Sequence, residues 1–163
     1  ARVDGLVDLQ IAVTDEEVNA LWKTRKALSP ALRNAAPSKI NEDVVVPVSR
    51  IPDLIRQLGK LSQSSGIRIV NFGHAGNGNI HVNLLFDPAT PGEQDKADEC
   101  LYTLFDLVLG LNGTLSGEHG IGLVKRDYIA RELDPVALRL MRDITRQFVP
   151  INMLNRGKGF PDE

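Results

Sequence analysis

The spacing of apolar residues between residues 44 and 116 alternates between strand-like and helix-like periods, and the order of these periods constrains the fold more than any other feature. Alternation with period two is typical of a half-buried strand, whereas spacing of three and four residues is typical of a helix. The predicted elements are a strand at 44–48, a helix at 51–63, strands at 67–74 and 80–86, a helix at 93–111 and a short strand at 113–116. The predicted order is therefore βαββαβ.

This order is the ferredoxin-like split-βαβ pattern, in which an antiparallel sheet carries its helices on one face. We therefore predict an α+β fold. Two further helical pieces are expected at the C-terminal end, at residues 125–132 and 135–148. The second has Asp134 as its N-cap and a proline at its first helical position.

The segment before the sheet begins with a strand-like apolar run over residues 1–13. Thr14, followed by three acidic residues, then predicts the start of a helix that runs to about Leu28. Residues 29–42 contain two prolines and several polar residues, which predict an irregular connector with room for one more helical turn. We expect residues 1–163 to form a single domain that belongs to a longer protein.

Charge and composition exclude several classes of partner. The 163 residues include 19 Lys and Arg against 21 Asp and Glu, so a net charge of −2 gives no reason to expect nucleic acid or an anionic membrane. No apolar run approaches the roughly 20 residues of a membrane span. The single cysteine, Cys100, excludes an intrachain disulfide and is expected to be a buried helix residue. These features predict a cytoplasmic protein with a small molecule or a protein as its partner.

The densest polar segment is the run from Gly73 to His81, and its spacing has a geometric meaning. If Asn77-Gly78 forms a two-residue hairpin turn, His74 lies directly opposite His81. Both imidazoles would then be close enough to bind one metal ion. Alternation puts Asn83 on the same face as His81 and the neighbouring apolar residues on the other face. A surface hairpin with two incidental histidines is the alternative.

A second polar segment, residues 113–122, places Glu118 beside His119 in a glycine-dense loop. All three histidines of the chain lie in these two segments. In a βαββαβ fold the last strand can join the same sheet, so Glu118 could complete a site of two histidines and one carboxylate. The topology alone carries this inference, because nothing else in the sequence brings the two segments together.

The glycines do not indicate a phosphate-binding loop. Neither segment has GxGxxG spacing between a strand and a long helix, and the P-loop pattern GxxxxGK[ST] is absent from the sequence. Ser116 lacks the context of a nucleophile elbow, which disfavours a Ser-His-Asp hydrolase.

Three segments, GHAGNGNIHVN, SGEHGIGLVKRDY and LNRGKGF, resemble the C-terminal domain of FAD-linked oxidases of the vanillyl-alcohol-oxidase superfamily. That family includes D-lactate dehydrogenase, the glycolate oxidase flavin subunit and D-2-hydroxyglutarate dehydrogenase. The resemblance covers essentially the whole chain. It implies that the metal ligands are His74, His81 and Glu118 and that His119 is the catalytic base.

The same resemblance implies further contacts with substrate and cofactor. Asn83 matches a substrate-contacting asparagine, and Arg25 lies in a segment like the family's WxxRxA, where its planar fork suits a substrate carboxylate. Ser29 and Lys39 correspond to further carboxylate contacts. Asn155 lies where the family has LNPGK near the flavin, although this chain has arginine in place of the proline.

The implied reaction is oxidation of a D-2-hydroxy acid to a 2-oxo acid, with FAD and a divalent metal (zinc, manganese or iron) as cofactors. Most contacts with FAD are expected from an N-terminal flavin domain of the parent chain, and a homodimer is left open. Two other classes stay open: a metal-dependent hydrolase that uses the same three ligands, and a noncatalytic metal-binding assembly module.

Overall fold

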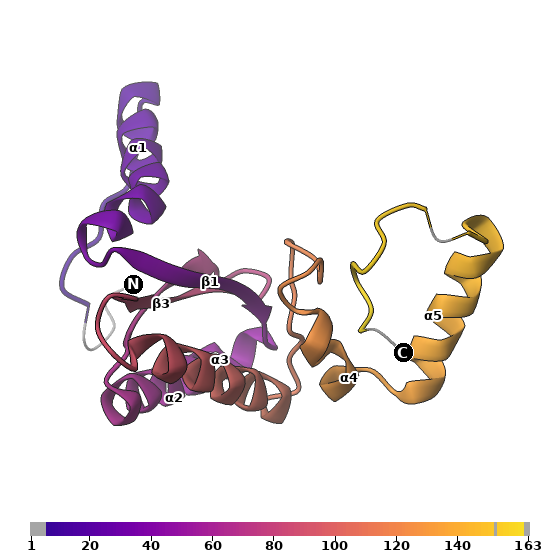
Figure 1. The fold of residues 1–163 in the computed structure, drawn as a ribbon. Coiled ribbons are helices and arrows are strands. Elements are labelled where there is room, and N and C mark those ends of the chain that lie inside the picture. Colours follow the sequence, from indigo (N-terminus) through magenta and orange to yellow (C-terminus); the bar gives the residue numbers. More distant parts are fainter. Residues whose placement is uncertain (1–5, 152, 162–163) are drawn as a thin grey trace. The chain divides into compact units, whose positions relative to one another are not determined.

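The computed structural model describes residues 6–151 and 153–161, and its architecture is α+β as predicted (Figure 1). The chain divides into a helical unit, residues 1–37, and a sheet unit, residues 38–163. We describe each unit by itself. Residues 6–13 form no strand, contrary to the expectation of a strand-like opening, while residues 1–5 lie outside the described residues.

The helical unit consists mainly of α1 (Asp15–Ala31), which begins where the sequence predicts. Thr14 Oγ1 accepts a hydrogen bond from the Glu17 N–H, and the Glu17 side chain accepts one from the Thr14 N–H. This reciprocal capping box satisfies two N–H groups that the helix itself leaves without a partner. The helix ends later than predicted, and the 3-10 turn η1 (Leu32–Asn34) follows it.

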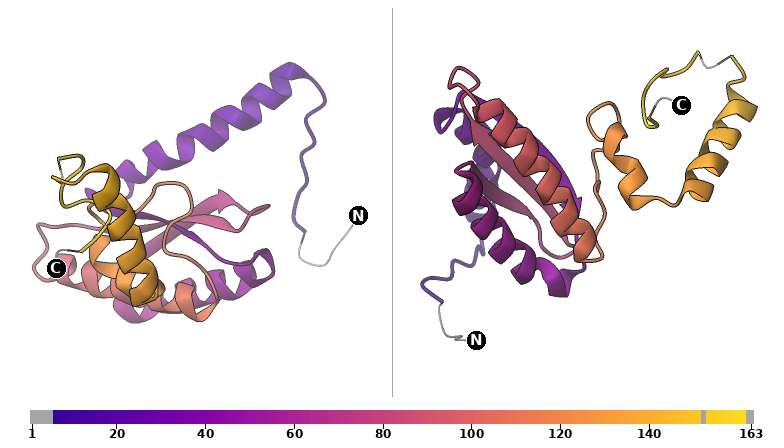
Figure 2. Two further views of the ribbon diagram at one scale, coloured as in Figure 1. Left: turned by 90° about the vertical axis from the view of Figure 1, so that its right-hand side faces the viewer. Right: turned by 60° about the horizontal axis from the view of Figure 1, so that its bottom comes forward.

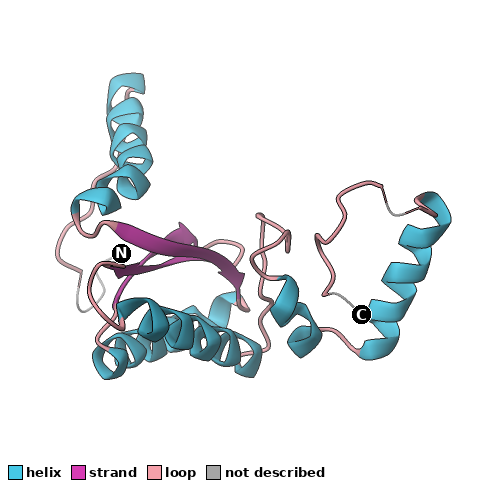
Figure 3. Cartoon of the chain, viewed as in Figure 1, coloured by secondary structure: helices cyan, strands magenta, loops and turns pink. Residues whose placement is uncertain are grey.

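The sheet unit contains an antiparallel sheet, drawn in magenta in Figure 3, with the strands β1 (Ser38–Val45), β2 (Arg68–His74) and β3 (Asn79–Phe86). The order of the strands in the sheet is β1-β3-β2. The split-βαβ pattern has this order, since β3 lies between the two strands that precede it in sequence. The predicted fourth strand is reduced to an isolated antiparallel bridge between Val45 and Thr114. That bridge nevertheless fixes the segment after α3 against the end of β1.

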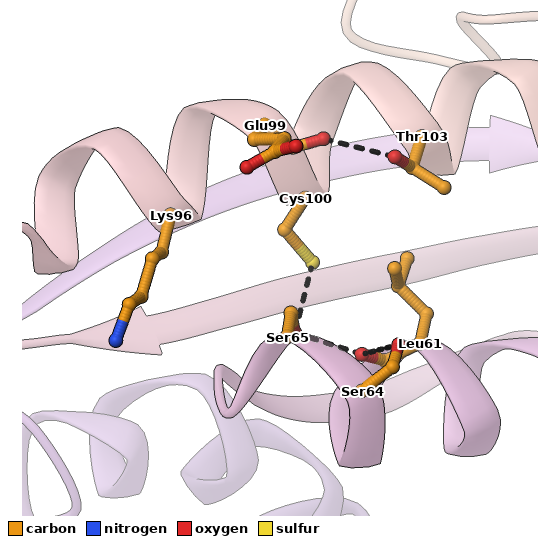
Figure 4. Close-up of a pocket in the computed structure, with 7 residues that line it drawn as sticks. All are labelled: Leu61, Ser64, Ser65, Lys96, Glu99, Cys100 and Thr103. Atoms are coloured by element: carbon orange, nitrogen blue, oxygen red, sulfur yellow. Dashed lines mark hydrogen bonds between the residues drawn. The ribbon is translucent and has the colours of Figure 1, made fainter.

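Two helices, α2 (Ile51–Ser65) and α3 (Glu93–Gly110), lie side by side on one face of the sheet (Figure 2). Both helices were predicted from the helical periodicity of their apolar residues, and both are confirmed. Gly66 ends α2 in a left-handed conformation. The core between helices and sheet is made of fully buried apolar side chains, among them Val44, Leu54, Leu58, Val82, Leu84, Leu104, Phe105 and Val108. Cys100 is buried between α2 and α3, as expected, with its Sγ 3.8 Å from Ser65 Oγ (Figure 4).

The first strand begins at Ser38, six residues before the predicted start at Val44. Residues 38–42 were expected to belong to an irregular connector, and this expectation is wrong. The prediction failed because the first half of β1 carries polar side chains. Lys39, Asn41 and Asp43 lie on the face of the sheet away from the helices, next to polar residues of β3. A strand with polar side chains at those positions lacks the apolar alternation by which strands are recognised.

The C-terminal part of the sheet unit contains η3 (Arg126–Tyr128), α4 (Ile129–Glu132) and α5 (Pro135–Phe148), and the short turn η2 (Val48–Arg50) precedes α2. The predicted helix 125–132 is thus split into a 3-10 turn and one α-helical turn. The Asp134 side chain caps α5 by accepting the Val136 N–H at 2.7 Å, as predicted. In the part of the chain that the structure describes, every helix is too short or too polar to cross a membrane.

Candidate metal centre

The hairpin between β2 and β3 brings two histidines together, in a register that differs from the prediction. Asn79 faces His74, and Phe72 faces His81, so residues 75–78 form a four-residue loop instead of a two-residue turn. His74 and His81 are diagonal neighbours and not direct partners. A shift of two residues keeps every side chain on its face. The imidazoles therefore still meet, with ring centroids 5.5 Å apart.

Glu118 completes the cluster from the segment after α3. Its Oε1 lies 3.0 Å from His81 Nε2 and 3.9 Å from His74 Nε2. Ligand atoms of these three residues all lie within 4.8 Å of one another. His81 is almost fully buried, whereas His74 and Glu118 are about half exposed. Two imidazoles and a carboxylate on one side, with solvent on the other, suit a divalent metal that keeps open positions for a ligand.

Gly117 packs closely against the strands where the two segments of this cluster meet. A Cβ atom on Gly117 would lie 2.9 Å from the Asn79 side chain and 2.8 Å from Val45 Cγ2. Real Cβ atoms essentially never approach other atoms so closely. The glycine therefore lets the backbone before Glu118 approach the strand that carries His81.

The protonation state of His81 fits a role as a metal ligand. Burial lowers the pKa of its imidazole, and this effect exceeds the opposing influence of the Glu118 carboxylate. The ring is therefore neutral over a wider pH range than a free histidine. Metal binding requires a neutral imidazole.

The side chain of His119 lies in the same cluster. Its ring stacks on that of His81, with centroids 5.5 Å apart and an interplanar angle of 21°. Nε2 of His119 is 3.8 Å from Glu118 Oε1. The side chain is 43% exposed, so a ligand at the cluster could reach it.

Two of the predicted substrate contacts share the polar face of the sheet with this cluster. The Lys39 ammonium donates to Asn83 Oδ1 at 3.4 Å, and the Asn83 amide donates to the Val70 carbonyl at 3.2 Å. Asn83 is fully buried. The expectation that Asn83 lies on the same face as His81 is confirmed by the strand register.

The remaining predicted contacts lie on other elements of the chain. Arg25 and Ser29 lie in α1 of the helical unit, where both are partly buried, and their role stays a prediction. Asn155 has a positive φ of 51° in a turn near the C-terminus. That region adjoins the second polar segment, because the Gly159 N–H donates to the Gly122 carbonyl at 2.8 Å. A flavin contact by Asn155 stays a prediction.

Sequence reasoning missed a buried ionic group beside the cluster. Asp43 is fully buried, and its Oδ2 accepts hydrogen bonds from the backbone N–H groups of Gly117, Glu118 and His119. The Lys125 ammonium lies 2.5 Å from Asp43 Oδ1 and 3.2 Å from Glu42 Oε2. The sequence signal for this group was the pair of acidic residues Glu42 and Asp43, which immediately precedes the valines of β1.

The charges of this group follow from its contacts. Burial by itself raises the pKa of Asp43, but hydrogen bonds from Lys125 and from the loop N–H groups outweigh it and hold the pKa well below its usual range. Burial raises the pKa of Glu42, with only partial compensation by Lys125. Asp43 is thus an ionised carboxylate at the base of the loop that carries Glu118 and His119.

The chain belongs to the family of FAD linked oxidases, C-terminal domain, which it matches over residues 1–159. The resemblance stated from its motifs is thereby confirmed.

Several curated proteins are similar to the chain. It is 34% identical over 154 residues to the glycolate oxidase subunit GlcD of Bacillus subtilis, and the matched region covers 94% of this chain and 33% of that protein. It is 35% identical over 154 residues to a D-lactate dehydrogenase of Archaeoglobus fulgidus, with coverage of 94% and 33%. A D-2-hydroxyglutarate dehydrogenase of Stutzerimonas stutzeri is 29% identical over 163 residues, covering 95% of this chain and 34% of that protein. The chain thus spans about a third of the length of these relatives.

Proposed function

We propose that this chain forms the metal- and substrate-binding part of an FAD-dependent dehydrogenase that oxidises a D-2-hydroxy acid to the 2-oxo acid. The observation that carries the proposal is the convergence of His74, His81 and Glu118, whose ligand atoms lie within 4.8 Å of one another although they come from two separate segments. The names of the relatives, which include glycolate oxidase, D-lactate dehydrogenase and D-2-hydroxyglutarate dehydrogenase, support the substrate class.

The chain's own residues suit the binding and proton-transfer steps of this reaction. His119 would take the proton of the substrate hydroxyl, since its imidazole adjoins the three ligands and is accessible. Lys39 would bind the substrate carboxylate, with Asn83 holding the ammonium in place. Arg25 and Ser29 would add further carboxylate contacts. A bound divalent ion supplies stabilisation of the developing alkoxide, and FAD supplies the oxidant that accepts the hydride.

The flavin would be held mainly by a preceding domain, with Asn155 as a contact from this chain. The relatives support this assignment, because the chain matches only about a third of their length and the matched family is a C-terminal domain. The metal would be zinc, manganese or iron, because all three accept imidazole and carboxylate ligands. A cytoplasmic location and a homodimer stay predictions.

Two other functions use the same cluster. A metal-dependent hydrolase would use His74, His81 and Glu118 around a metal-bound water, and a noncatalytic module would use them to stabilise an assembly. Absence of flavin reduction by any 2-hydroxy acid in the complete flavoenzyme would favour the hydrolase. A lower free energy of unfolding with unchanged turnover, on removal of a ligand, would favour the module.

Calorimetric titration of Zn²⁺ and of Mn²⁺ into this chain tests the joint site directly. We expect stoichiometric binding that both Glu118→Ala and His81→Ala abolish, because each removes one of three ligands. Glu99→Ala is the matched control, since Glu99 is an exposed glutamate on α3 outside the cluster. Binding that is indifferent to Glu118 would remove the joint site from the proposal.

The role of His119 is tested in the complete flavoenzyme. We expect His119→Gln to lower kcat by about 100- to 10,000-fold, the usual contribution of a positioned general base, while stoichiometric metal binding persists. Retained turnover would exclude His119 as the base.

A further inference from the structure

The carboxylate of Asp43 is bound on both of its oxygens, and each oxygen has a different set of partners. Oδ2 accepts the N–H groups of Gly117, Glu118 and His119 at 2.8, 2.5 and 2.9 Å. Three consecutive N–H groups that converge on one anion form a backbone nest. This oxygen therefore anchors the part of the loop that carries the third metal ligand and the proposed base to β1, in addition to the bridge between Val45 and Thr114.

The other oxygen, Oδ1, faces two side chains. Lys125 Nζ lies 2.5 Å from it, and His119 Nδ1 lies 3.5 Å from it. Lys125 is itself 3% exposed and also donates to the Asp43 carbonyl at 3.0 Å. A lysine buried in this way is held by its carboxylate partners and has no alternative contact with water. Oδ1 is thus fixed in direction, and its remaining lone pair is available to the imidazole.

We propose that Asp43 is a positioning residue that keeps the proton of neutral His119 on Nδ1 and so leaves Nε2 free to accept the substrate proton. This inference rests on the proposed function only in naming His119 as the base. The anchoring of the loop and the selection of the tautomer are carried by different oxygens of the same carboxylate.

The chemistry of the two groups favours this tautomer. An ionised carboxylate can only accept hydrogen bonds, so the imidazole nitrogen that faces it must carry the proton. A neutral imidazole has one N–H, so the other nitrogen, Nε2, holds a lone pair. Nε2 lies 3.8 Å from Glu118 Oε1, but that oxygen already faces His81 Nε2 at 3.0 Å, so Asp43 Oδ1 is the nearer acceptor for the proton of His119. The Nδ1 to Oδ1 distance of 3.5 Å is longer than a normal hydrogen bond, as is common before a ligand binds.

Stacking on His81 restricts the ring in a second direction. The two rings lie 21° from parallel with centroids 5.5 Å apart. A half-turn of the His119 ring about its Cβ–Cγ bond keeps this plane, so stacking fixes the plane of the ring and not the positions of its two nitrogens. The stack therefore sets the plane of the ring, and the contact of Nδ1 with Asp43 Oδ1 distinguishes the two nitrogens within that plane.

The variant Asp43→Asn separates the two tasks of the carboxylate. The amide oxygen can still accept the three loop N–H groups, whereas the amide nitrogen, which can only donate, replaces Oδ1 beside His119. His119 Nδ1 must then accept, and the proton moves to Nε2. The loop stays anchored while the tautomer is reversed, with Lys125 keeping Glu42 and the backbone carbonyl as partners.

Long-range ¹H–¹⁵N NMR spectra of the ¹⁵N-labelled chain, recorded at a pH where the imidazoles are neutral, report the tautomer of each histidine. The sequence has three histidines, so the variants His74→Gln, His81→Gln and His119→Gln assign every signal. We expect His119 as the Nδ1–H tautomer in the wild type and as the Nε2–H tautomer in Asp43→Asn. Asp127→Asn is the control, since Asp127 is 71% exposed and outside the cluster, and it should leave the spectrum unchanged.

Two results would overturn the proposal: an Nε2–H tautomer of His119 in the wild type, or an unchanged Nδ1–H tautomer in folded Asp43→Asn. The first needs no variant, so the proposal stays testable even if Asp43→Asn does not fold. In the complete flavoenzyme, Asp43→Asn should lower kcat by about 10,000-fold, as expected when a histidine base is held in the wrong tautomer. Absence of turnover or metal binding in the wild type would instead contradict the proposed function and leave the tautomer result standing.

Discussion

The two faces of β3 are buried to a similar degree but carry opposite chemistry. On the face that meets α2 and α3, Ile80, Val82 and Leu84 are at most 5% exposed. On the other face, Asn79, His81 and Asn83 are at most 7% exposed, although all three side chains are polar. The same strand therefore contributes both to the hydrophobic core and to the candidate metal centre.

Burial has opposite consequences on the two faces. Each fully buried apolar side chain stabilises the fold by about 1.5 to 3 kcal/mol. A buried polar side chain opposes folding unless its hydrogen bonds are made within the protein. The polar face is therefore better explained by ligand binding than by stability. Substitutions on one face should leave the property that depends on the other face intact.

The largest effect on stability is expected from Phe105→Ala on the core side. Phe105 is fully buried, and its ring packs against Tyr128 with centroids 4.7 Å apart. Its removal should lower the free energy of unfolding, measured by urea denaturation, by about 3 to 5 kcal/mol. Glu99→Ala on the exposed side of α3 should change it by about 0.5 kcal/mol or less. Weakened metal binding in the folded fraction of Phe105→Ala would show that the two faces are not independent.

Metal should stabilise the fold through the opposite face. A metal ion at about 100 times its Kd should raise the free energy of unfolding by about 2.7 kcal/mol, provided that it binds only the folded chain. The shift should disappear in Glu118→Ala, because the third ligand is lost, and should persist in Glu99→Ala. Urea denaturation with and without Zn²⁺ measures it. An equal shift in Glu118→Ala would place the bound metal elsewhere.

An intermediate effect is expected from Gly117→Ala, where the two polar segments meet. The added Cβ would lie within 3 Å of the Asn79 side chain and of Val45, so the loop must move away from the sheet. We expect a loss of about 1 to 3 kcal/mol in stability. Metal affinity should fall by about 10- to 100-fold, as for other residues that support metal ligands. Gly76→Ala is the matched control, since a Cβ there meets no atom within 4 Å. Equal effects of the two substitutions would remove the role assigned to close packing.

The core face could be predicted from the sequence more completely than the polar face. Apolar periodicity depends on local spacing, and it located α2, α3, β2 and β3 with boundary errors of only a few residues. The register of the hairpin was wrong by two residues because Asn77-Gly78 suggested a tighter turn than the loop 75–78. The prediction that both histidines share one face survived, since an even shift preserves the face of every side chain.

The buried ionic group could not be predicted in the same way. Asp43 and Lys125 are 82 residues apart, and no period in the sequence connects them. Asp43 was also missed because the strand was expected to begin at Val44. Contacts of this kind depend on the tertiary arrangement of β1 and the loop after α3, which only the structure supplies.

The smallest effect is expected within the core itself, from the titration of Cys100. Burial raises the pKa of its thiol, and the hydrogen bond with Ser65 offsets this only in part (Figure 4). The unfolded chain therefore releases the thiol proton at lower pH than the folded chain does. The stabilising contribution is complete below the pKa of the unfolded thiol and is lost as the pH rises through the pKa of the folded thiol. Urea denaturation at pH values across this range should show a slight fall in stability with rising pH that Cys100→Ala removes. Because Cys100 lies on the helix side of the sheet, Cys100→Ala and the wild type should have the same metal affinity at each of these pH values. A different metal affinity in Cys100→Ala would contradict the separation of the two faces.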